Sequence, residues 1–322
     1  MKKPLILQIC IPFCVKQCAF CAFPYCTYDP RTVNAYAKAL LTEIEAWKGE
    51  WDDHEVRAIS IEGGSPALLG ADSLFHVLQK IRRTFHCAED VTIRLQTMPG
   101  DYSRALMEKM RDAGVNHWII GLETASRNEH ELLARPYKYE AITMADMAIR
   151  TFHPRALGFH LLLGIPGQTR ESLESTLSRC LYYAPEHIIA QPLMIPERSA
   201  MASQIRTEAL QPMPEDTLQE LIDFTRTFLC ERGFQPSTKW DYVKPGFEDR
   251  CQLLQLQGCE RLGLGYHSTS WMDGVLWRTG HSLQEYLEHP GDFETLAADM
   301  IRPDTTDPAA LKELFDPLHI LL

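Results

Sequence analysis

Three cysteines near the start of the chain, Cys14, Cys18 and Cys21, have a spacing that suits iron–sulfur chemistry. Cysteine thiolates hold iron–sulfur clusters, and gaps of three and two residues let one loop reach three corners of the same cluster. Three protein ligands leave one iron of a four-iron cluster open, and an open iron can bind a small molecule directly. The spacing therefore favours a [4Fe–4S] cluster that takes part in catalysis over one that only carries electrons.

A zinc site and scattered reduced thiols are the alternatives. Structural zinc sites usually use two pairs of cysteine or histidine ligands, with the second pair further along the chain. No clean second pair follows these cysteines. Cys10 and Cys26 flank them at gaps that zinc could use, but Cys10 falls in a predicted strand and Cys26 lies beyond the short loop.

The residues around the cysteines carry a family resemblance. The sequence CIPFCVKQCAFC over residues 10–21 resembles the opening motif of radical S-adenosylmethionine (SAM) enzymes. It is most similar to the subgroup of oxygen-independent coproporphyrinogen III dehydrogenase and its heme-chaperone relatives. The resemblance implies that the open iron binds the amino and carboxylate groups of SAM, and that reduction cleaves SAM to methionine and a 5′-deoxyadenosyl radical.

Composition indicates a globular protein that works on a small molecule. The chain has 322 residues, 45% of them hydrophobic, and a formal charge of −11, which argues against a nucleic-acid partner. No apolar run is long enough to span a bilayer, so we expect no membrane partner and a cytoplasmic location. The ten cysteines are expected to be reduced thiols and metal ligands. The resemblance adds a reducing partner such as flavodoxin or ferredoxin.

Short apolar, β-branched stretches alternate with segments of helical periodicity, which predicts an α/β fold with a parallel sheet. The predicted strands are Leu5–Phe13, Arg57–Glu62, Val91–Thr97, His117–Glu123, Leu157–Gly164 and His187–Leu193. The predicted helices are Thr32–Lys48, Ala71–Phe85, Ser103–Ala113, Lys138–Thr151 and Arg170–Tyr183.

About six βα units are too few for a closed eight-stranded barrel, so we expect an open, partial parallel β/α barrel with ligands at the carboxyl ends of its strands. The alternation of strand and helix patterns ends after about residue 205. A polar helix, Glu215–Arg232, then leads into a mixed α+β extension. We therefore predict a radical SAM partial barrel over residues 1–205 and a capping or substrate-binding region over residues 206–322.

Two motifs at strand ends are candidates for contacts with SAM. Gly63 and Gly64 lack side chains, so the backbone of Gly63-Gly64-Ser65 can approach a ligand closely, although a tight structural turn would explain the same residues. The motif resembles the glycine-rich motif that meets the SAM amino group. Arg135 matches the family's arginine for the SAM carboxylate, and Glu123 lies where other radical SAM branches carry a glutamate near the ribose. A solvated arginine at a helix end is the alternative.

Four further residues complete the predicted SAM site by resemblance. Phe20 is the aromatic residue before the third cysteine, and Ile165, in the turn Gly164–Thr169, could cover the adenine. Gln96 stands where the family has a glutamate that touches SAM. His160 stands where the subgroup has an aspartate, and a satisfied core histidine is the alternative.

Other departures bear on the reaction. Gln8 and Cys10 replace a tyrosine and a histidine of the family, and residues 251–255, Cys-Gln-Leu-Leu-Gln, replace the His-Asn-x-x-Tyr motif of the heme chaperones. The leading hypothesis is a radical SAM enzyme whose 5′-deoxyadenosyl radical abstracts hydrogen from a small-molecule or tetrapyrrole-like substrate. Radical methyl transfer is an alternative within the fold. A non-catalytic heme or metal carrier that keeps the cluster is an alternative of another class.

Overall fold

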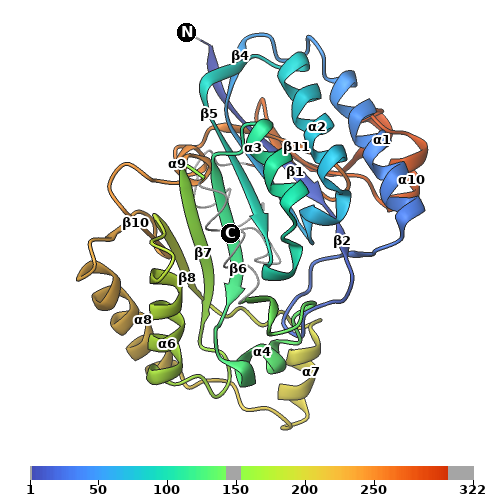
Figure 1. The fold of residues 1–322 in the computed structure, drawn as a ribbon. Helices are drawn as coiled ribbons and strands as arrows, with labels where there is room; N and C mark the ends of the chain where they lie inside the picture. The colour runs from blue at the N-terminus through green and yellow to red at the C-terminus, as the bar shows by residue number, and fades with distance from the viewer. Residues whose placement is uncertain (1, 143–153, 304–322) are drawn as a thin grey trace.

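The predicted strands lie side by side in chain order as the parallel centre of one twelve-stranded sheet. The computed structural model describes residues 2–142 and 154–303 (Figure 1). The central strands are β1 (Lys3–Ile11), β4 (His54–Gly63), β5 (Cys87–Thr97), β6 (His117–Glu123), β7 (Ala156–Leu163) and β8 (His187–Pro192). The sheet stays open, which confirms the partial β/α barrel.

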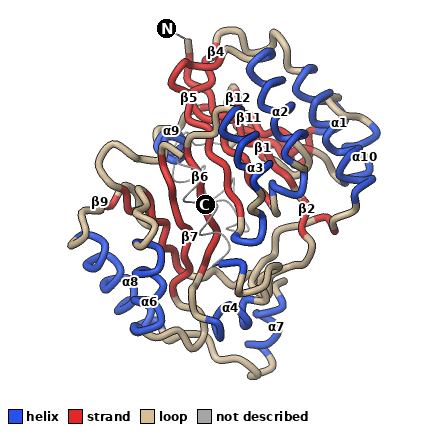
Figure 2. The backbone as a smooth tube through the Cα atoms, in the orientation of Figure 1, coloured by secondary structure: helices blue, strands red, loops and turns tan. Residues whose placement is uncertain are grey.

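Helices cover the outer face of the sheet, and α1, α2 and α3 lie next to one another along it (Figure 2). Sequence periodicity located four helices correctly: α1 (Pro30–Ala46), α2 (Ala71–Thr84), α3 (Arg104–Asp112) and α6 (Arg170–Leu181). The predicted helix Lys138–Thr151 falls mostly outside the described residues. A short helix that periodicity missed, α4 (Arg127–Leu133), follows β6.

The two faces of β1 differ in character because successive side chains of a strand point to opposite faces. Leu7, Ile9 and Ile11 are buried in the main hydrophobic core with residues of α1 and α2. Gln8, on the other face, contacts Glu62 of β4 inside the barrel. The apolar outer face therefore holds the helices, and the inner face is free to carry polar groups.

Residues after 205 extend this sheet at both edges. Strand β10 (Asp241–Val243) pairs antiparallel with β8, and β11 (Glu260–Leu264) pairs parallel with β1. The sheet order is completed by β9 (Gln235–Pro236), β12 (Thr269–Met272), β13 (Val275–Thr279) and β14 (Ala297–Ile301). Helix α7 (Ala200–Arg206) lies at the predicted boundary, and the helices after it are α8 (Glu215–Cys230), α9 (Arg250–Leu256), α10 (Leu283–Glu288) and α11 (Phe293–Leu296). The boundary at residue 205 remains a prediction.

A buried carboxylate joins α1 to this later part of the chain. Glu43 accepts hydrogen bonds from the backbone N–H of Gly265 and from the Tyr286 hydroxyl, both at 2.7 Å. Burial raises the pKa of Glu43 to about 7, although both hydrogen bonds favour its charged form.

Within the described ranges, no helix is both long and apolar enough to cross a membrane.

Candidate cofactor site

A short parallel ladder closes the base of the cysteine loop. Strand β2 (Phe13–Cys14) pairs with β3 (Cys26–Thr27), and the N–H of Tyr28 donates to the Cys14 carbonyl at 3.0 Å. Within the loop, the Cys21 N–H donates to the Cys18 carbonyl at 3.2 Å. Cys14, Cys18 and Cys21 are free and half-buried. The ladder thus fixes the ends of the loop and leaves its thiols accessible to a ligand.

The three thiols affect one another electrostatically. Burial, followed by the nearby Cys18 and Cys21 thiols, raises the pKa of Cys14 to about 12, and Arg135 opposes this shift. Burial also raises the pKa of Cys21. Without a metal the Cys14 and Cys21 thiols are therefore protonated at neutral pH, and metal binding must displace their protons.

The Gly63–Gly64 turn packs directly against the cysteine loop. Gly63 has a φ of +117°, and a Cβ there would lie 2.7 Å from the Ile11 carbonyl oxygen. A Cβ on Gly64 would lie 2.4 Å from the Phe13 carbonyl oxygen and 2.8 Å from the Cys14 sulfur. Only glycine therefore fits at both positions, because the end of β4 lies so close to Ile11 and to the start of the cysteine loop.

A buried ion pair stands at the end of β6. The Nη2 of Arg135 lies 2.8 Å from Glu123 Oε2, and its Nη1 donates to the Cys18 sulfur at 3.3 Å. Arg135 follows Ala134, whose φ of +52° ends helix α4 and turns the chain toward the cysteines. Glu123 itself has a φ of +61°, a left-handed conformation that is costly for a side-chain-bearing residue and that concentrates at functional sites.

His160 lies beside this ion pair with both ring nitrogens unused. It is 4% exposed, and its Nδ1 is 3.7 Å from Glu123 Oε1, too far for a hydrogen bond. Among the described residues neither nitrogen has a hydrogen-bond partner, and the same holds for Nε of Arg135. Buried polar atoms are normally satisfied, so these atoms indicate a ligand position.

One pocket brings most of the predicted site together. The predicted residues that line it are Cys14, Cys18, Phe20, Cys21, Gly63, Gly64, Gln96, Glu123, Arg135 and His160. Ser65 and Ile165 are not among its lining residues. The Ser65 hydroxyl donates to Asp101 at 3.0 Å, and Ile165 is buried in a small apolar cluster with Leu162, a residue of the pocket wall. Their contacts with SAM remain predictions.

Sequence reasoning missed several lining residues, including Asp101, Gln191 and Met194. Burial raises the pKa of Asp101, although the N–H of Met98 and the hydroxyl of Ser65 donate to its carboxylate. Asp101 and Gln191 follow or end β5 and β8, so their position at the carboxyl edge of the sheet was the signal that could have found them.

The residues present fit an iron–sulfur cluster and SAM. Three thiols face one pocket, Gly64 leaves Cys14 unobstructed on one side, and buried donors without partners surround the same space. The donor set is the soft thiolate set that iron–sulfur clusters require, and the guanidinium suits a carboxylate.

Comparison with known proteins defines the class. The family model described as the radical SAM superfamily matches residues 9–180. The chain belongs to the radical SAM superfamily, whose cofactors are a [4Fe–4S] cluster and SAM.

Within this family the chain is similar to the heme chaperones and to an oxidase. It is 25% identical over 307 residues to the heme chaperone HemW of Escherichia coli, covering 90% of this chain and 79% of that protein. HemW of Lactococcus lactis is 21% identical over 288 residues, covering 89% and 75%. The structure of coproporphyrinogen III oxidase (HemN) from Escherichia coli superposes with a TM-score of 0.80 at 20% identity, covering 98% of this chain and 76% of that chain.

Proposed function

We propose that this protein is a radical SAM enzyme that removes a hydrogen atom from a small-molecule or tetrapyrrole-like substrate. When bound, the cluster would supply the electron that cleaves SAM and yields the 5′-deoxyadenosyl radical. The observation that carries the proposal is the convergence of the cluster cysteines, the Gly63–Gly64 turn and the Glu123–Arg135 pair on one pocket.

The chain's own groups suggest how SAM would be held. The guanidinium of Arg135 contacts both Cys18 and Glu123. It therefore lies close enough to the cluster cysteines to pair with the carboxylate of a SAM molecule bound at the cluster. The unused nitrogens of His160 could donate to, or accept from, the ribose hydroxyls. Gln96 offers an amide in place of the family's glutamate, which lowers the negative charge of the pocket.

Apolar side chains form part of the same pocket. Phe20, Phe23, Leu162 and Met194 line it, and side chains of this kind exclude water from a reactive intermediate. Val15 and Lys16, next to the first cysteine, are exposed. A reducing partner such as flavodoxin or ferredoxin could approach the cluster at this exposed part of the loop.

The test is anaerobic reconstitution with iron and sulfide, reduction with dithionite, and mass-spectrometric counting of 5′-deoxyadenosine formed from SAM. We expect turnover in the unmodified protein and none in the Cys14→Ala/Cys18→Ala/Cys21→Ala variant. Substrate-dependent S-adenosylhomocysteine in the same samples would instead support methyl transfer. A loaded cluster that never cleaves SAM would contradict the enzyme proposal.

Heme carriage is the second candidate, and the similarity to proteins named heme chaperones favours it. Cys251 stands in the place of their histidine motif, but it is 3% exposed, and burial raises its pKa well above the usual range. It would need a rearrangement to reach heme. Hemin titration with and without His267→Ala tests this candidate, because His267 is more accessible than Cys251. Tight SAM binding without a Soret shift would exclude the carrier.

A further inference from the structure

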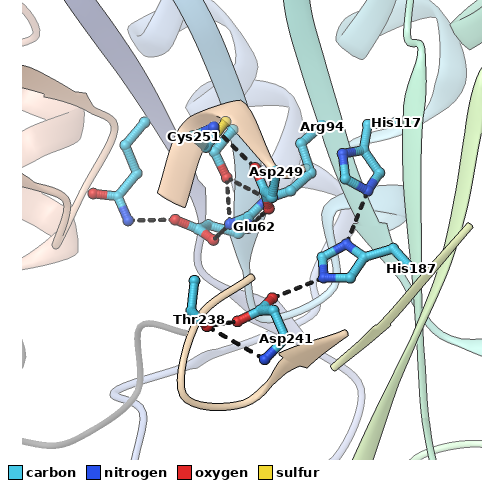
Figure 3. A network of polar contacts seen from close by, with 10 residues as sticks. Glu62, Arg94, His117, His187, Thr238, Asp241, Asp249 and Cys251 are labelled. Atoms are coloured by element: carbon cyan, nitrogen blue, oxygen red, sulfur yellow. Dashed lines mark hydrogen bonds and ion pairs between the residues drawn. The ribbon is translucent and has the colours of Figure 1, made fainter. Parts of the chain in front are cut away.

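A second group of potential metal ligands lies at the end of the barrel opposite the cofactor pocket. His117 and His187 are the first residues of β6 and β8, and Asp249 is the residue before α9 (Figure 3). One ligand atom of each lies within 4.8 Å of the other two. All three are buried, at 3%, 0% and 2% exposure. We call these residues the basal cluster.

Hydrogen bonding fixes the tautomer of His187. Its Nε2 lies 2.7 Å from Asp241 Oδ1, and the Thr238 hydroxyl donates to the other oxygen of that carboxylate. Since an ionised carboxylate only accepts, Nε2 carries the proton and Nδ1 keeps its lone pair. Nδ1 faces Nε2 of His117 at 3.1 Å. A carboxylate that orients a histidine in this way is the usual outer partner of a metal-bound imidazole.

Asp249 is held in place with acceptor capacity to spare. Its Oδ2 accepts from Nη1 of Arg94 at 2.7 Å, and its Oδ1 accepts from the Cys251 N–H at 2.9 Å. A carboxylate has about four lone-pair sites, so these contacts leave room for a metal ion. The contacts also fix the oxygens close to the histidine pair.

The surroundings of the basal cluster carry more negative than positive charge. Glu62, Asp241 and Asp249 are at most 7% exposed. Among the described lysines and arginines, Arg94 is the one within hydrogen-bonding distance of these carboxylates, contacting Glu62 at 2.9 Å and Asp249 at 2.7 Å. Uncompensated buried charge is costly. Among the described residues, a cation bound at the basal cluster would help to balance this negative charge.

We propose that His117, His187 and Asp249 bind a divalent transition-metal ion at a site separate from the iron–sulfur cluster. Two imidazoles and one carboxylate are a donor set that zinc and ferrous iron accept. Ligand atoms of a tetrahedral site with bonds of about 2.0–2.1 Å lie roughly 3.3 Å apart, and the facing histidine nitrogens are already at 3.1 Å. An Asp249 oxygen lies within 4.8 Å of both histidine nitrogens, so metal binding would have to draw this carboxylate closer to them, at the expense of its present contacts with Arg94 and the Cys251 N–H.

The position of the site suggests what the metal would do. His117 and His187 come from strands of the barrel, whereas Asp249 and the supporting Asp241 come from the part of the chain after residue 205. A metal bound here would tie α9 and β10 to the barrel strands. The role is structural and does not depend on the reaction at the cofactor pocket.

The test uses the full chain with Cys14, Cys18 and Cys21 changed to alanine, so that the cluster thiolates cannot compete. Titration with Zn²⁺ against a chromophoric chelator should give one ion per chain. His117→Asn and His187→Asn should each weaken binding by about 100-fold or more, and Asp241→Asn by about 10- to 100-fold. Zn²⁺ in excess should raise the Tm by roughly 5 °C.

His54→Gln is the matched control. His54 is a buried histidine at the start of β4 with two carboxylate neighbours, each at 2.6 Å, but it lies outside the basal cluster. Its replacement should leave Zn²⁺ affinity unchanged. Absence of stoichiometric binding, or equal weakening in His54→Gln, would overturn the proposal.

The absorption spectrum of bound Co²⁺ tests the site without any substitution in the basal cluster. The result therefore holds even if the histidine variants fail to fold. We expect d–d absorption typical of nitrogen and oxygen ligands. A thiolate-to-cobalt charge-transfer band would place the ion at another cysteine, such as Cys251, and would also overturn the proposal.

Discussion

Removal of Arg135 should separate its contribution to stability from its contribution to SAM binding. The side chains of Arg135 and Glu123 are 7% and 6% exposed and meet at 2.8 Å. Arg135→Ala would leave the Glu123 carboxylate buried without its partner. Breaking a buried pair from one side costs about 3–5 kcal/mol, so we expect the free energy of unfolding of the cluster-free protein to fall by that amount.

The double variant Arg135→Ala/Glu123→Gln should recover much of this loss, because neither member of the pair then remains charged. Urea denaturation under anaerobic, reducing conditions, followed by circular dichroism, measures all four corners of the double-mutant cycle. A single variant as stable as the unmodified protein, or a double variant no more stable than the single one, would refute the reasoning from the buried pair.

SAM binding should not recover in the double variant. Loss of a charge-assisted hydrogen bond costs about 1.5–3 kcal/mol, which is roughly a ten- to hundred-fold weaker Kd. Equilibrium dialysis with the reconstituted protein measures this. Arg135→Lys is the matched control, since it keeps the charge but loses the planar fork. Unchanged affinity in Arg135→Ala would remove Arg135 from the SAM site.

Three further outcomes are expected. Gly64→Ala should lower the iron bound after reconstitution, because its Cβ would lie 2.8 Å from the Cys14 sulfur; full iron loading with an unchanged visible spectrum would contradict this. His160→Ala should weaken SAM binding by about three- to ten-fold, the scale of one neutral hydrogen bond, and isothermal titration calorimetry would detect it. The pKa of Glu43 is about 7 in the folded protein and 4.5 ordinarily. Its protonation therefore contributes fully to the free energy of unfolding below pH 4.5, and this contribution is lost as the pH rises to 7. The loss should reach about 3 kcal/mol and be absent in Glu43→Gln when urea denaturation is repeated across this range.

The strands of the barrel were predictable because each is a short apolar run at regular spacing, and the helices α1 and α2 because their apolar residues recur with a helical period. The cysteine spacing and the glycine pair located the pocket for a similar reason, since both are local in sequence. Helix α4 is too short for periodicity to detect.

The basal cluster could not be predicted from local patterns. His117, His187 and Asp249 are far apart in sequence, and only the sheet register and the return of the chain through α9 bring them together. Strand β11 was missed for a related reason. Glu260–Leu264 is short and contains a glycine, and its place beside β1 depends on a pairing between two segments that are far apart in the sequence.

The pairing of β11 with β1 has a consequence for the order in which the protein can be completed during synthesis. Strand β1, which leads into the cysteine loop, is made well before residues 260–264, which form its second neighbour. Until those residues leave the ribosome, one edge of β1 has no partner, and open strand edges are prone to wrong pairing. We therefore expect cluster insertion to succeed best after translation has ended, when the strand beneath the cysteines is held on both sides.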